Sequence, residues 1–343
     1  MPALNRRFLL RARPSGDFDP KIMERVVGPV PEPGPGQALV RNRYLSLDPT
    51  NRIWMSEGES YLPPVALGSV MRGIAYGEVV ASNGAPYRIG TKVVGMLGWQ
   101  DYALVSAADE LPVTPLPAFL PVKPTDALGV LGGTGMTAYF GLLDIGKPRR
   151  GETVVVSAAA GAVGSIVGQI AKIYGARAVG IAGTREKCDW LVNELGFDAA
   201  ICRRDPDWRA QLEAACPDGI DVDFENAGGE IMEAVMDLMN LHGRVVLCGM
   251  ISQYGKADRS NLGPANFVNV LFKRLKIQGF IIIDYIPRFP LAQARMLWWL
   301  KRGRIKDRHT LLRGLDNAPA ALTGLFRGEN TGKLLVELDE PPG

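Results

Sequence analysis

The chain has 343 residues, which at roughly 150 residues per domain corresponds to about two domains. Its 47% hydrophobic and 22% charged residues are typical of globular proteins and exclude a disordered chain or a small disulfide scaffold. A formal charge of +3 gives no indication of a nucleic-acid or membrane partner. We therefore expect a small-molecule substrate.

The longest uncharged run, residues 153–171, has the length of a membrane helix. It contains three glycines and several polar residues, so we do not expect it to span a membrane. Residues 1–20 include no apolar segment followed by a cleavage site, which favours a cytoplasmic location. Four widely spaced cysteines form no CxxC pair, so we expect neither a disulfide framework nor a zinc cluster.

Residues 28 to about 125 contain short β-like runs separated by glycine- and proline-rich turns. Examples are QALVRNRYLSL at 37–47, GEVVAS at 77–82 and KVVGMLGWQDYALVS at 92–106. These runs predict a β-rich first unit.

From about Leu128 onward, strand-like and helix-like segments alternate. Repeated βαβ units require a parallel sheet covered on both faces. The pattern predicts helices at 163–174, 185–195 and 287–302, and a final strand in TGKLLVELD at 331–339 that returns to the first unit. It predicts the strands of the sheet at 153–157, 176–183, 198–201, 221–225, 244–249 and 276–283.

The strongest motif is SAAAGAVGSIVGQIAKIYGA, in which Gly161, Gly164 and Gly168 follow an apolar strand and open a helix. Glycines here allow the backbone to approach a pyrophosphate, and the helix N-terminus offers free N–H groups to phosphates. A merely packed glycine-rich turn is the alternative. The complete strand–turn–helix context favours a dinucleotide site.

The end of the second predicted strand indicates which dinucleotide binds. A site for NAD usually places an acidic residue there, whereas this chain has Gly183, Thr184, Arg185, Glu186 and Lys187. Small residues leave room for a 2′-phosphate, and Arg185 and Lys187 can neutralise it. We therefore predict NADP(H), with a solvated helix start as the alternative.

The chain has only two histidines, His242 and His309, and no cysteine–histidine cluster in its first unit. It therefore lacks the ligands of a catalytic zinc site, and we expect no metal. No G-x-S-x-G motif is present. Tyrosines, water and the cofactor itself are then the candidate proton donors.

Several separated motifs together resemble the zinc-independent branch of the medium-chain dehydrogenase/reductase superfamily. Within that branch the chain is similar to the leukotriene B4 dehydrogenase, prostaglandin reductase and alkenal double-bond reductase group. The resemblance extends from about Tyr44 to Val336. The motifs are GMTAYFGLL, SAAAGAVGS, ENAGGE, LCGMISQY, GFIIIDY and GENTGK.

The resemblance implies a Rossmann domain, a doubly wound parallel sheet, inserted in a GroES-like β-rich catalytic domain. The expected ranges are 1–127 for the catalytic domain, 128–300 for the Rossmann domain and 301–343 for the return. The resemblance also implies a homodimer, in which the Rossmann sheets of the two subunits join edge to edge. GFIIIDY would be the edge strand. The residues expected to bind NADPH are Met136, Thr137, Gly161, Ala162, Val163, Gly164, Thr184, Arg185, Lys187, Arg203, Asn226, Cys248, Gly249, Ile251, Tyr254, Phe280, Ile281, Ile282 and Asn330.

The implied activity is NADPH-dependent reduction of the carbon–carbon double bond of α,β-unsaturated ketones and aldehydes. Hydride goes to the β-carbon, and the resulting enolate oxygen needs a hydrogen-bond donor. The chain departs from the family at two positions where relatives have a tyrosine. This chain has Phe272 at one of them and Arg203 at the other. Tyr254 and Tyr61 are therefore the candidate catalytic residues. Quinone reduction and a non-catalytic NADPH sensor are the alternatives.

Overall fold

The chain folds into two structural units, each built from separated segments. The computed structural model describes residues 4–58, 60–117, 122–255 and 263–340. The first unit comprises Met1–Leu128, His309–Asn330 and Leu334–Gly343, and the second comprises Gly129–Arg308 and Thr331–Lys333. Residues 301–308 thus belong to the second unit, although the sequence grouped 301–343 with the first.

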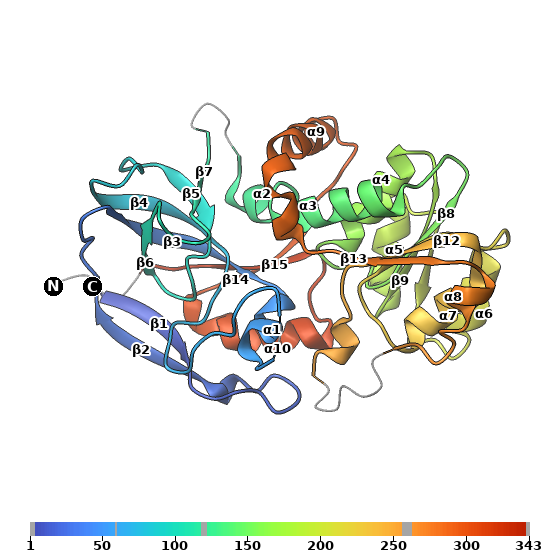
Figure 1. Ribbon diagram of the computed structural model, residues 1–343, viewed down its shortest axis with the longest axis horizontal. Coiled ribbons are helices and arrows are strands. Elements are labelled where there is room, and N and C mark those ends of the chain that lie inside the picture. The colour runs from blue at the N-terminus through green and yellow to red at the C-terminus, as the bar shows by residue number, and fades with distance from the viewer. Residues whose placement is uncertain (1–3, 59, 118–121, 256–262, 341–343) are drawn as a thin grey trace. The chain divides into compact units, whose positions relative to one another are not determined.

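Antiparallel strands dominate the first unit. The C-terminal strand β15 pairs with β3, so both ends of the sequence contribute to one sheet (Figure 1). Tyr76, Leu128 and Leu335 are buried together in a small apolar core. The elements are β1 Leu4–Leu10, β2 Met23–Pro29, β3 Gln37–Leu47, α1 Thr50–Met55, β4 Ala75–Asn83, β5 Lys92–Gly95, β6 Tyr102–Ser106, β7 Thr114–Pro115, α2 Pro124–Leu128, β14 His309–Arg313, α10 Ala318–Arg327 and β15 Lys333–Glu337.

The second unit contains a parallel sheet, six-stranded within the part of the chain that the structure describes. Its order is β10-β9-β8-β11-β12-β13. Numbered along the chain this is 3-2-1-4-5-6, the order of a Rossmann sheet. The strands are β8 Thr153–Val156, β9 Arg177–Ala182, β10 Ala199–Cys202, β11 Ile220–Glu225, β12 Met239–Leu247 and β13 Lys276–Gly279.

Helices cover both faces of this sheet. Gly168 of α4 and Gly180 of β9 both pack against Phe197, which follows α5. On the opposite face, Val155 and Val245 pack with residues of α6 and α7. The helical elements are α3 Gly133–Phe140, the π-helical η2 Gly141–Gly146, α4 Gly164–Ile173, α5 Arg185–Asn193, α6 Trp208–Ala215, α7 Glu230–Leu238, the 3-10 segment η3 Ile251–Gln253, α8 Asn269–Phe272, the 3-10 segment η4 Ile282–Arg288 and α9 Phe289–Lys301.

The predicted strand at 276–283 is wrong in its second half. β13 ends at Gly279, and residues 282–288 form η4 instead. The physical reason is the neighbouring strand: β12 ends at Leu247, which pairs with Gly279, and the chain then turns toward Glu225, so the ladder does not continue. The edge strand is therefore Lys276–Gly279, and GFIIIDY contributes only its first residue.

Residues 153–171, the longest uncharged run, divide into β8, a loop and the first part of α4. No helix in the described ranges is both long enough and apolar enough to cross a bilayer.

Candidate cofactor and active site

The sheet order reverses beside β8, which lies between β9 and β11. The loops at the carboxyl ends of β8 and β11 therefore leave in opposite directions, which is where sheets of this kind usually have their ligand crevice. All strands are parallel, so the other loops that follow strands lie at the same edge. The predicted groups 161–164, 184–187, 226, 248–254 and 280–282 each follow a different strand of this sheet.

The glycine-rich loop after β8 is closely packed. A Cβ on Gly164 would lie 2.7 Å from the Ala158 carbonyl oxygen, and one on Gly168 would lie 1.9 Å from Cζ of Phe197. The tail of the chain also contacts this loop, because the Gly332 N–H donates to the Ala160 carbonyl at 2.8 Å. Glycine at these two positions lets the loop fold closely on itself and lets α4 approach Phe197.

The start of α4 fits the diphosphate of a dinucleotide. Its N-cap residue, Val163, makes no side-chain hydrogen bond to the first turn. The N–H groups of Ser165 and Ile166 already donate to the Gly161 and Val163 carbonyls, at 3.1 Å each, so a phosphate would meet the N–H groups that precede them and the positive end of the helix dipole. Gly161, Ala162 and Val163 are half-buried rather than buried, so the loop presents backbone surface to a phosphate.

A cationic group follows β9 and β10. Thr184 is the N-cap of α5 and accepts a hydrogen bond from the Lys187 N–H. Burial and the nearby Arg204 lower the pKa of Lys187. Arg203 is exposed beside Arg204, whereas Arg185 is paired with Asp205 at 3.3 Å. Lys187, Arg203 and Arg204 together give these two loops a cationic character, which suits a phosphate.

Tyr254 lies at the end of η3, in the loop that follows β12. Its hydroxyl oxygen accepts the Met250 N–H at 3.2 Å and keeps its own proton for donation. Burial, together with Cys248, raises the pKa of Tyr254. The hydroxyl therefore stays protonated at neutral pH, as a proton donor requires.

The remaining predicted residues lie in different settings. Phe280 packs its ring against Gly141, and Ile281 and Ile282 are half-buried beyond β13. Thr137 is half-buried on α3, with its hydroxyl bonded to the Gly133 carbonyl. Met136 is completely buried in α3 and has no surface to offer a bound molecule.

Two predicted residues, Tyr61 and Asn330, belong to the first unit. Both are half-buried, and Tyr61 acts electrostatically on Arg72.

Phe272 ends α8, is 64% exposed and precedes β13. It therefore lies near the amino end of that strand, the edge of the parallel sheet opposite to the predicted loops.

Sequence reasoning did not identify Ser157, Glu225 or Arg204. Ser157 and Glu225 are buried and hydrogen-bonded to each other, one at the start of the glycine-rich loop and the other at the end of β11. A glutamate that ends a buried strand is the signal that could have identified this pair. For Arg204, the signal is the paired arginine in ICRRD.

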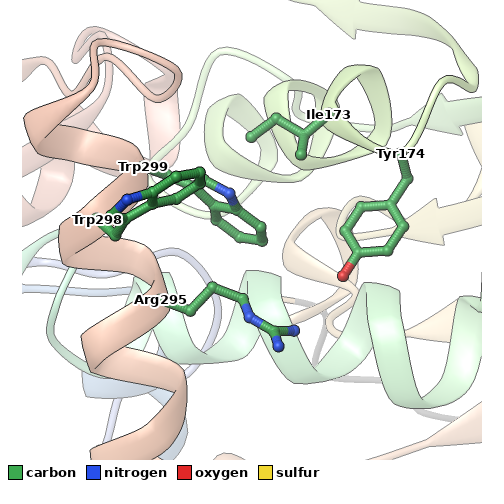
Figure 2. Close-up of a pocket in the computed structure, with 5 residues that line it drawn as sticks. All are labelled: Ile173, Tyr174, Arg295, Trp298 and Trp299. Carbon is green, nitrogen blue, oxygen red and sulfur yellow. The ribbon is translucent and has the colours of Figure 1, made fainter.

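A cavity of about 480 Å³ lies elsewhere on the second unit, lined by Ile173, Tyr174, Arg295, Trp298 and Trp299 (Figure 2). Ile173 and Tyr174 end α4, whose first residue adjoins the glycine-rich loop. The cavity is thus separated from that loop by the length of the helix, about 15 Å. Arg295 donates a hydrogen bond to the Tyr139 hydroxyl there.

Comparison with known proteins identifies the family. Residues 6–113 match the family described as the N-terminal domain of oxidoreductase, and residues 162–298 match the one described as zinc-binding dehydrogenase. The chain is 43% identical to NADPH-dependent curcumin reductase of Escherichia coli, over 97% of each protein. It is 39% identical to the NADP(+)-dependent 2-alkenal reductase of Nicotiana tabacum, over 90% of this chain and 88% of that protein.

A solved structure gives the same result. The chain is 44% identical to CurA from Vibrio vulnificus in complex with NADPH, with a TM-score of 0.92 over 98% of this chain and 100% of that one. Sequence identity and fold therefore agree over nearly the whole length. The chain belongs to the medium-chain dehydrogenase/reductase superfamily, in the group of NADP-dependent oxidoreductases that contains the curcumin, 2-alkenal and prostaglandin reductases.

Proposed function

We propose that this chain is an NADPH-dependent reductase of the carbon–carbon double bond in α,β-unsaturated ketones and aldehydes. The observation that carries the proposal is the full-length similarity to enzymes named for that chemistry, at 43% identity for curcumin reductase and 39% for 2-alkenal reductase. The crevice beside β8, with a helix N-terminus on one side and Asn226 on the other, supports it.

NADPH is the proposed cofactor. The N–H groups around Gly161–Gly164 would hold its diphosphate, and Lys187 and Arg203 its 2′-phosphate. Thr184, Arg185, Asn226, Cys248, Gly249 and Ile251 would line the rest of its path in the second unit. The contact expected from Asn330 stays a prediction.

The bound NADPH supplies the hydride that reaches the β-carbon of the substrate. Negative charge then develops on the carbonyl oxygen, and a donor placed there stabilises the transition state. We propose Tyr254 or Tyr61 for this role. Tyr254 has the better support, because its hydroxyl is half-buried and protonated and its loop follows a strand of the cofactor-binding sheet.

The test of this function follows NADPH consumption against 2-alkenals, 2-enones, a quinone and a saturated ketone, with NADH in parallel. We expect consumption with the alkenals and enones, a preference for NADPH, and a saturated carbonyl product rather than an allylic alcohol. Reduction of the quinone alone would favour the quinone-reductase alternative. Binding of NADPH without turnover of any compound would favour the sensor.

We further propose a homodimer joined at the edge of the Rossmann sheet. β13 is the edge strand, and an exposed apolar cluster precedes it. Exposed apolar patches beside an unpaired edge mark interfaces. The cluster is Phe267, Val268, Leu271 and Phe272, which are 52–72% exposed.

Light scattering tests the dimer. Wild type should have twice the chain mass, and Leu271→Glu should reduce that mass toward the monomer. Ile89→Glu, at a 68% exposed position in the first unit, is the control that should leave the mass unchanged. A monomeric wild type would refute the proposal.

We also propose a cytoplasmic location, which suits the four free cysteines.

A further inference from the structure

Ser157 and Glu225 join the two loops that form the crevice. Ser157 follows β8 directly, and its hydroxyl donates to Oε1 of Glu225 at 2.5 Å. The same hydroxyl oxygen accepts the N–H groups of Asn226 at 2.7 Å and Ala227 at 3.2 Å. The Asn226 side-chain amide donates to the Ser157 carbonyl at 2.8 Å. A single serine thus holds the first residues of the neighbouring loop.

Glu225 is the acceptor at the centre of this arrangement. Besides the serine hydroxyl, its Oε1 accepts the N–H groups of Ala227 at 2.5 Å and Gly228 at 2.9 Å. These bonds turn the chain sharply after β11, where Gly228 and Gly229 have φ angles of +73° and +62°. Oε1 of Glu225, together with the Ser157 hydroxyl, therefore anchors the start of residues 226–229.

The third loop, which follows β12, is attached to the same segment. The N–H groups of Cys248 and Gly249 donate to the main-chain carbonyl of Glu225, at 2.9 and 3.0 Å. Ser252 donates to the Ala227 carbonyl through both its N–H, at 3.0 Å, and its hydroxyl, at 2.6 Å. The segment 226–229 is thus bonded to the glycine-rich loop on one side and to the loop of Tyr254 on the other.

Keeping a carboxyl group at this place is costly. Ser157 and Glu225 are both completely buried, and burial raises the pKa of Glu225 despite the hydrogen bonds that oppose it. An apolar side chain would avoid that penalty, since burying a polar group is unfavourable unless its bonds compensate. Compensation is partial, because Oε2 has no hydrogen-bond partner among the described residues and all three of the side-chain bonds go to Oε1, where they shape the loop after β11.

We propose that Glu225 is a positioning residue, which together with Ser157 holds residues 226–229 in the conformation that binds NADPH. The inference rests on the proposed function only for the identity of the ligand. It assigns Glu225 no contact with the cofactor. A crevice that is already ordered saves the entropy of ordering its loops when the ligand binds.

The experiment compares Glu225→Gln with Glu225→Met. Both side chains are close in length to glutamate, but only glutamine keeps an acceptor oxygen for the hydroxyl and the two N–H groups. We measure the NADPH dissociation constant by fluorescence without substrate, amide hydrogen exchange of residues 226–229 without NADPH, and the melting temperature. Ser157→Ala is the second variant, which removes one hydroxyl and adds no bulk.

Glu225→Met should weaken NADPH binding about tenfold and speed exchange at 226–229, since it leaves buried donors without acceptors. Ser157→Ala should act in the same direction, and Glu225→Gln should stay within about threefold of wild type. A lower melting temperature with unchanged binding and exchange would overturn the proposal. If wild type bound no NADPH, the proposed function would fail, while the exchange rates would still test the role of Glu225 in ordering the loop.

Discussion

Lys187 lies close enough to Arg204 for the guanidinium charge, together with burial, to lower the pKa of the lysine. Two like charges near one another cost free energy unless an anion joins them. Arg204 follows β10 and Lys187 follows β9, so the proposed 2′-phosphate site would draw its cations from two neighbouring loops.

Lys187→Ala should weaken NADPH binding by about 10- to 100-fold, the range for losing one charged hydrogen bond. NADH lacks the 2′-phosphate, so the dissociation constant for NADH should change by less than about threefold. Titration of both cofactors against the same protein preparation gives the ratio. Equal losses for the two cofactors would place Lys187 outside the 2′-phosphate site.

Gly168→Ala should destabilise the protein by about 1–3 kcal/mol, the usual cost of overpacking. The new Cβ would lie 1.9 Å from Cζ of Phe197, so either the ring or α4 has to move. Gly133→Ala is the matched control, because a Cβ there has no heavy atom within 4 Å. Denaturant unfolding should show the loss for Gly168→Ala only, and comparable stabilities of the two variants would contradict the packing argument.

Asp223 is a completely buried carboxylic acid in the centre of the sheet, in register with Val155 and Val245. Neither of its carboxyl oxygens has a hydrogen-bond partner among the described residues. Burial, together with Glu225, raises its pKa well above the usual range. The folded protein therefore retains a proton that the unfolded chain releases.

Because the folded-state pKa lies above the unfolded one, the contribution of Asp223 to stability falls as pH rises from the ordinary carboxyl pKa toward the raised value. Asp223→Val should reduce this slope and raise the free energy of unfolding at pH 8 by about 1–3 kcal/mol. Urea titrations at pH 5 and pH 8 measure both effects. A less stable Asp223→Val at pH 8 would mean that the carboxyl group is needed.

Tyr254→Phe should lower kcat for an enone by about a hundredfold, the typical loss of one donor to a developing oxyanion. The raised pKa of Tyr254 implies that its hydroxyl loses its proton only above the ordinary tyrosine range, so kcat should show no alkaline limb from it between pH 6 and 9.

Tyr61→Phe is the companion variant. Tyr254→Phe also loses the hydrogen bond from the Met250 N–H, so the NADPH dissociation constant of that variant is measured as well. An unchanged dissociation constant would assign the fall in kcat to the lost proton donor. If kcat fell for Tyr61→Phe and not for Tyr254→Phe, the donor would be in the first unit.

Much of the fold could be predicted from local pattern. The all-buried strand TVVV and the glycine-rich helix after it occur where periodicity places them, as β8 and α4. Parallel strands bury both faces, so their sequences are continuous apolar runs that are easy to recognise. The exception is FIII after β13, where the same apolar run forms a 3-10 segment because β12 has already ended.

The sequence by itself determined the order of the strands and helices and the glycine-rich turn, because each depends on neighbours within one βα unit. The tertiary structure alone decided that Ser157 and Glu225 meet, that Arg204 lies near Lys187 and that the buried Asp223 has no hydrogen-bond partner among the described residues. Each depends on how neighbouring strands and the loops after them come together, which is set by register and packing over the whole unit rather than by local sequence.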